Sequence, residues 1–111
     1  MADSLETRGK NAGMNGVMDA LTDLDLTTSG GTVLSTVSII GTAFSIVASG
    51  DATNDGAIVF TLEVGDIGSI ATQVHFKQST NIMMKVDLDT TLAITHAGEA
   101  TIAAGDLSVT L

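Results

Sequence analysis

Alternation of apolar and polar side chains is the feature that most limits how this chain folds, and it runs from residue 32 to the last residue. In "AIVFTLEV", for example, Ile58, Phe60 and Leu62 fall on one face of an extended chain. Gly, Asn, Asp and Ser, which turns favour, interrupt the alternation about every 8 to 12 residues. The sequence therefore predicts a mainly β fold, an antiparallel β-sandwich or jelly-roll-like domain of about eight short strands.

The alternating runs define the strands that we expect, which are residues 32–40, 42–49, 57–64, 69–76, 81–88, 91–97, 100–104 and 107–111. Asn54-Asp55-Gly56 lies between two of these runs and predicts a hairpin, because Asn and Gly tolerate the positive φ of tight hairpin turns. The glycine-rich segment 27–32 is expected to connect a preceding helix to the first strand.

The first part of the chain has a different period. Met14, Val17, Met18 and Leu21 are spaced i, i+3, i+4 and i+7, which is the apolar stripe of an amphipathic helix. We therefore expect an N-terminal α-helix, with residues 1–24 forming a helical arm and residues 25–111 forming a single β domain.

A second face of this helix carries small residues, namely Gly9, Gly13, Gly16 and Ala20. Each glycine lowers helix propensity by about 1 kcal/mol, so several on one face suggest close approach to another backbone. A weak, frayed helix explains the same glycines. The sequence-based candidates for an interaction surface are the residues of both faces: Gly9, Gly13, Met14, Gly16, Val17, Met18, Ala20 and Leu21.

Charge excludes two classes of partner. The chain has 13 acidic and 4 basic residues, with a net charge of −9. Nucleic acids and anionic membrane surfaces both require clustered Lys and Arg, so neither is an expected partner. Residues 26–50 lack charge, but Ser, Thr and Gly are frequent there, and Asp25 and Asp51 flank them in place of basic residues. We do not expect this stretch to span a membrane.

One motif raises the question of a metal. Asp51, Thr53, Asp55 and Gly56 occupy positions 1, 3, 5 and 6 of an EF-hand loop, but position 12 is Leu62 and the flanks have strand patterns. We therefore expect a turn and no metal, and a loose calcium site that is not an EF-hand stays open as an alternative.

Catalytic groups are not arranged in any recognisable pattern. His75 is expected at the surface beside Gln73 and Lys77, and His96 is in line with apolar residues and is expected to be satisfied by its neighbours. Asp87 and Asp89 share a polar strand face with Lys85, as is typical of a solvated face. There is no nucleophile elbow, phosphate loop or zinc-binding helix motif. We expect a protein that is not an enzyme and has no cofactor.

Several segments resemble a family of short bacteriophage structural proteins. They are the helix "GKNAGMNGVMDAL", the hairpin formed by "GTVLSTVSI" and "AFSIVASGDA", the strands in "SIATQVHFKQSTNIMMKVDL", and the closing pair "ATIAAGDLSVTL". The resemblance covers nearly the whole chain. It implies a virion component without catalysis, most readily a capsid decoration (cement) protein that stabilises the phage head.

The resemblance also implies the partners, which are the major capsid protein or another virion protein, and a small homo-oligomer, either a dimer or a trimer. The alternative functions are a neck or tail structural component and a receptor- or carbohydrate-binding tail component. Sugar sites usually use aromatic platforms, and only 3% of this chain is aromatic.

Overall fold

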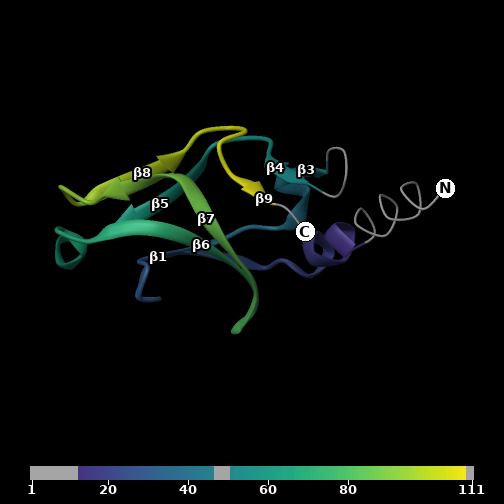
Figure 1. The fold of residues 1–111 in the computed structure, drawn as a ribbon, viewed down its shortest axis with the longest axis horizontal. Helices are drawn as coiled ribbons and strands as arrows, with labels where there is room; N and C mark the ends of the chain where they lie inside the picture. The colour runs from purple at the N-terminus through teal and green to yellow at the C-terminus, as the bar shows by residue number, and fades with distance from the viewer. Residues whose placement is uncertain (1–12, 47–50, 110–111) are drawn as a thin grey trace.

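The structure is a computed structural model that describes residues 13–46 and 51–109. A helix covers residues 13–20. It is followed by β1 (Asp23–Thr27), β2 (Val33–Ser38), the 3-10 helix η1 (Gly41–Ala43), β3 (Phe44–Ile46), β4 (Ala52–Asn54), β5 (Ile58–Leu62), the 3-10 helix η3 (Val64–Asp66), β6 (Ile70–Gln78), β7 (Asn81–Ala93), β8 (Gly98–Ile102) and β9 (Ser108–Val109). The prediction of a mainly β domain with an N-terminal helix is confirmed (Figure 1).

The strands form three hydrogen-bonded groups, with the orders β2-β1-β6-β7, β3-β4-β9 and β5-β8. All of the strand pairs in these groups are antiparallel. β2 also lies beside β5, so the four-stranded sheet and the β5-β8 pair enclose a common core. The β3-β4-β9 group lies toward the helix (Figure 1).

The core is built from the alternating stripes that the sequence predicts. Ile58, Phe60 and Leu62 are buried while the residues between them are exposed. Phe76 of β6 packs against Phe44 of β3, with their ring centroids 5.3 Å apart and the rings tilted. Burial of aliphatic and aromatic side chains of this kind supplies the main stabilising free energy of a domain this small.

The apolar stripe of the helix belongs to this core. Met14, Met18 and Leu21 are buried, and Val17 packs partly buried against the same cluster. Gly41 of η1 lies against the backbone carbonyl of Met18, where a Cβ atom would collide with it. A glycine is therefore required at this close contact between η1 and the helix. In the described residues, no helix is long and apolar enough to cross a membrane.

Strand β1 differs from the sequence-based expectation, in which segment 27–32 connects the helix directly to the first strand. β1 is a central strand of the sheet and is buried on both faces from Leu24 to Thr27. Its start at Asp23 also lies before residue 25, where the β domain was expected to begin. Asp25 and Thr27 are polar residues of this strand that are buried rather than solvated, so the sequence of β1 lacks the pattern of a core strand.

The hairpin predicted at Asn54-Asp55-Gly56 is wrong. β4 pairs with β3 and β9, whereas β5 pairs with β8. The reason lies in the buried side chain of Asn54, whose Nδ2 donates to the carbonyl oxygens of Gly56 (2.8 Å) and Ala103 (2.9 Å). Its Oδ1 accepts the N–H of Leu107 at 3.0 Å. These bonds tie β4 to the segment before β9, and the chain then crosses to the other strand group.

Residues 81–88 and 91–97 were expected to form two strands, but β7 is continuous from Asn81 to Ala93. Its pairing with β6 contains a large irregularity, in which Ala71 pairs with Leu92 and Gln73 pairs with Asp87. The break between the two alternating runs in the sequence thus corresponds to a bulge within a single strand.

Candidate functional site

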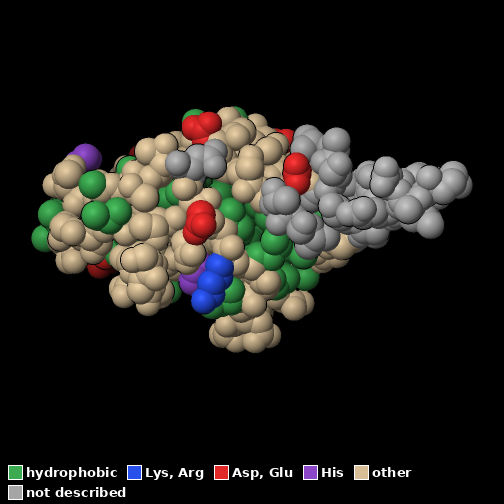
Figure 2. Space-filling model, in the orientation of Figure 1, with side chains coloured by type: hydrophobic (Ala, Val, Ile, Leu, Met, Phe, Trp, Pro, Cys, Tyr) green, Lys and Arg blue, Asp and Glu red, His purple; other side chains and the backbone are tan. Residues whose placement is uncertain are grey.

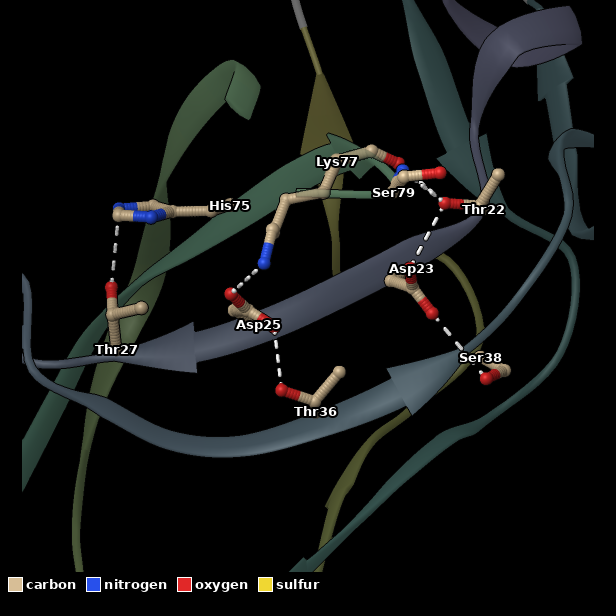
Figure 3. A network of polar contacts seen from close by, with 9 residues as sticks. All are labelled: Thr22, Asp23, Asp25, Thr27, Thr36, Ser38, His75, Lys77 and Ser79. Carbon is tan, nitrogen blue, oxygen red and sulfur yellow. Dashed lines mark hydrogen bonds and ion pairs between the residues drawn. The ribbon is translucent and has the colours of Figure 1, made fainter. Parts of the chain in front are cut away.

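The polar face of the four-stranded sheet carries a network of interacting polar side chains (Figure 3). At its centre Asp25 of β1 is only 2% exposed. Its Oδ2 lies 3.0 Å from Nζ of Lys77 on β6, and its Oδ1 accepts a 2.7 Å hydrogen bond from Oγ1 of Thr36 on β2. One carboxylate therefore links three adjacent strands.

His75 lies on the same face, directly opposite Asp25 in the register of β1 and β6. It is 3% exposed, so the expectation of a surface histidine is wrong. Its Nε2 lies 3.3 Å from Oγ1 of Thr27 and 3.4 Å from Oε1 of Gln73. Burial lowers the pKa of His75, and the positive charge of Lys85 lowers it further.

A second group of polar contacts lies at the edge of this face. Thr22 Oγ1 accepts the N–H of Ser79 at 2.7 Å and donates to Oδ2 of Asp23 at 2.9 Å. Ser38 Oγ donates to the other carboxylate oxygen of Asp23 at 3.3 Å. These contacts join the start of β1 to the end of β2 and to the β6–β7 turn (Figure 3).

The pair of Thr27 and His75 resembles a nucleophile beside a general base, and for this reason it is the arrangement closest to catalytic chemistry. Thr27 is completely buried, however, so no substrate reaches its hydroxyl. The carboxylate of Asp25 is bound by Lys77 and Thr36 and does not orient the imidazole. We interpret the polar face as a structural link between strands.

The remaining polar residues singled out in the sequence lie apart from one another. Asp55 accepts a 2.6 Å hydrogen bond from Ser45, and Asp87 accepts one of 2.9 Å from Gln73. His96 is exposed rather than in line with the core. The side chain of Asp89 lies outside the described part of the chain. Among the residues that are described, no group of three or more His, Asp or Glu side chains is arranged to hold a metal ion.

The residues of the helix that were predicted to form an interaction surface fall into a buried group and an exposed group. Met14, Met18 and Leu21 are buried in the core of their own chain, and Val17 and Ala20 are half-buried. Gly13 and Gly16 are exposed, and nothing lies within 4 Å of a Cβ atom placed on Gly16. Gly9 lies outside the described residues.

An exposed apolar surface that the sequence reasoning missed lies where β5 turns into β6. Val64, Ile67 and Ile70 are 75%, 46% and 52% exposed. We call these three residues the apolar end patch. Figure 2 shows hydrophobic side chains gathered at this end of the molecule, on the left of the view. Their spacing of three residues, in a segment "EVGDIGSI" between two strand patterns, is the signal that identifies them.

The backbone beneath the apolar end patch is well fixed. The N–H of Glu63 donates to Oδ2 of Asp66 at 2.9 Å, and the N–H of Ile67 donates to the carbonyl of Val64 at 3.2 Å. The next residues bond to the residue that follows β7, because the N–H of Gly68 donates to the carbonyl of Ile94 at 2.9 Å. The apolar side chains therefore project from a segment that is held at both ends.

Comparison of the chain with family models, with curated proteins and with solved structures gave no match.

Proposed function

We propose that this protein is a non-enzymatic assembly module that docks on a larger particle, and that it acts as a decoration protein on a phage head. The observation that carries the proposal is the apolar end patch. Three aliphatic side chains at one end of the molecule are held by a hydrogen-bonded segment and exposed to solvent. Large apolar groups that cluster on a small domain are typical of surfaces that bind other proteins.

The free energy available from burying the apolar end patch favours docking of many copies on one particle. Burying an aliphatic side chain contributes about 1.5 to 3 kcal/mol when it moves from full exposure, and these residues are already partly covered. A patch of this size therefore gives weak binding for one copy. A particle offers many equivalent positions, and an oligomer such as a dimer or trimer would add avidity.

The resemblance of the helix and strand segments to short phage structural proteins supports the choice of particle. The net charge of −9 is compatible with this role, since like charge disfavours non-specific aggregation of the unbound protein. A neck or tail position is the alternative within the same class, because an end patch of this kind suits either location.

Carbohydrate binding is less well supported. All three phenylalanines of the chain, Phe44, Phe60 and Phe76, are buried in the core. They leave no aromatic platform for a sugar ring, which is the usual basis of glycan recognition.

The test uses phage particles stripped of this protein and measures the amount of added protein that sediments with them. We expect the double variant Val64→Asp, Ile67→Asp to bind at least about tenfold more weakly, because two charged groups would be buried in an apolar contact. Val59→Asp is the control for an added charge at a partly exposed valine, since Val59 is 39% exposed on β5 and is not one of the residues of the apolar end patch.

Both variants should keep the far-ultraviolet circular dichroism spectrum of the unmodified protein. Equal binding by the double variant and the unmodified protein would refute docking through the apolar end patch. Electron microscopy of particles carrying the bound protein would then distinguish the head from the neck and tail, because the added density would lie on only one of them.

A further inference from the structure

The strands around the core form a ring that is open on one side. Going around it, β7, β6, β1 and β2 are joined by hydrogen bonds, β2 lies beside β5, and β5 is joined to β8. β7 and β8 each have one hydrogen-bonded neighbour in these groups. We call the gap between residues 88–92 of β7 and residues 100–102 of β8 the open seam. In Figure 1 the two strands diverge from the end at which residues 94–97 connect them.

The bulge in β7 contributes to this opening. Between the pairs Ala71–Leu92 and Gln73–Asp87, β6 has one residue, Thr72, whereas β7 has the four residues 88–91. The ladder is interrupted here, and Oγ1 of Thr72 is buried without a hydrogen-bond partner among the described residues. Bulges of this kind bend a strand and redirect its edge.

A groove of about 310 Å³ lies in the open seam. Beneath it lie Leu26 and Phe60, which are almost completely buried, so the apolar surface that is open in the groove comes from the half-buried Leu88, Leu92 and Ile102. Its walls include Leu92 of β7 and Ile102 of β8. Asp106, at the rim, is the one charged residue among the described residues that line the groove.

The two walls are strand edges. In an antiparallel pair, every second residue directs its N–H and C=O away from the partner strand, so β8 presents such groups to the side opposite β5. An apolar floor beneath a free strand edge is the arrangement that binds an added strand, in which main-chain hydrogen bonds supply affinity and alternate side chains enter the pocket.

We infer that the open seam binds an extended segment of another protein, which adds as a strand along β8. Its alternate side chains are small and aliphatic, since the groove is at the lower end of the volumes of ligand pockets and its floor is apolar. A Lys or Arg of the segment lies beside Asp106.

Charge favours a different protein over a second copy of this chain. Each copy carries a net charge of −9, which disfavours a second copy at the open seam, whereas a basic segment is attracted to Asp106 and to the acidic chain as a whole. The open seam is formed by different residues from the apolar end patch, so this inference does not rest on the proposed docking function.

The test is binding of a synthetic peptide, Lys-Thr-Val-Thr-Val-Thr-Val-Lys, to the full-length protein, followed by nuclear magnetic resonance of the backbone amides. We expect saturable shifts in residues 88–92 and 98–102. The same peptide with Pro in place of its central Thr should bind at least about tenfold more weakly, because proline removes an N–H from the ladder and does not fit within a strand.

Two charge variants test the role of Asp106. Asp106→Lys should weaken binding of the Lys-ended peptide by about threefold or more and should strengthen binding of the same peptide with Glu at both ends. Asp19→Lys makes the same change of charge on an exposed position of the helix and should leave the preference for the Lys-ended peptide unchanged.

Three results would overturn the inference. One is the absence of saturable binding, and another is equal binding of the peptide that contains Pro, which would indicate a pocket for side chains rather than for a strand. The third is a concentration-dependent shift of the same amides without any peptide, which would identify a second copy as the occupant of the open seam.

Discussion

His75 is an ionisable group placed where its charged form is disfavoured. It is buried in the sheet, with Lys85 opposite it on β7 and with Lys77 and Asp25 beside it. Burial and Lys85, the two largest influences, lower its pKa below the ordinary value of 6.5, although Asp25 acts in the opposite direction. The unfolded chain therefore binds the proton more readily than the folded chain does.

From this difference we predict the pH dependence of stability. The contribution of neutral, buried His75 to the free energy of unfolding is complete above about pH 6.5. It is lost as the pH falls through the lowered pKa of the folded state. Urea unfolding between pH 7.5 and pH 5 should show this loss in the unmodified protein. The loss of stability at low pH should be smaller in His75→Gln. It should be unchanged in His96→Gln, because His96 is exposed. An identical pH profile for all three proteins would contradict the prediction.

The ion pair of Asp25 and Lys77 leads to a second prediction at this scale. Lys77→Met leaves the buried carboxylate with Thr36 as its remaining partner, so we expect the free energy of unfolding to fall by about 2 kcal/mol. Adding Asp25→Asn should restore part of the loss, because a buried neutral amide is less costly than an unpaired charge. Lys85→Met, at an exposed position, should change stability by less than about 0.5 kcal/mol. Equal losses in the two single lysine variants would refute this interpretation.

At the scale of elements, the segment "DATNDG" shows how a local pattern is overridden. Its turn residues predicted a hairpin, and its acidic spacing suggested a calcium loop. The deciding residue is Asn54, which makes three hydrogen bonds from a buried position and holds β4 against the chain before β9. Two of these hydrogen bonds join Asn54 to residues 49 and 53 positions away in the sequence. A local sequence pattern cannot predict such bonds.

The third prediction follows from this arrangement. Asn54→Asp keeps the shape of the side chain but replaces the donor Nδ2 with an oxygen that faces the carbonyls of Gly56 and Ala103. We expect a loss of about 2 to 3 kcal/mol in urea unfolding, since the buried side chain at position 54 loses two hydrogen bonds and its new oxygen faces two carbonyl oxygens. The neighbouring exposed change Asp55→Asn is the control. A loss in Asn54→Asp no greater than in Asp55→Asn would show that these bonds contribute little.

At the scale of the whole molecule, the described residues 13–24 contribute to the core of the β domain. Met14, Met18, Leu21 and Leu24 are all buried in the core cluster, and β1 begins at Asp23. Deleting this range would remove four core side chains, each worth about 2 kcal/mol or more when buried, and would shorten a central strand.

We therefore predict that a protein lacking residues 1–24 does not unfold cooperatively. Thermal unfolding followed by circular dichroism should show no sigmoidal transition, whereas Gly16→Ala, on the exposed face of the same helix, should unfold cooperatively and somewhat more stably. A cooperative transition in the shortened protein would show that the helix is dispensable for the fold.

The amino-acid sequence by itself determined the fold class and which side of several elements is buried. Period-two alternation identified the β5 stripe, and the i, i+3, i+4 spacing identified the buried side of the helix, because these signals depend only on the geometry of one element. The turn residues marked the ends of strands but not which strands they join.

Only the tertiary structure decided the strand pairing, the burial of the polar sheet face and the two candidate surfaces. β1 is a strand whose polar residues Asp25 and Thr27 are satisfied by partners on β2 and β6, and such partners lie far away in the sequence. The apolar end patch and the open seam arise where chain segments end or separate. Exposure at such places depends on which neighbours the fold supplies, and a local sequence pattern does not contain that information.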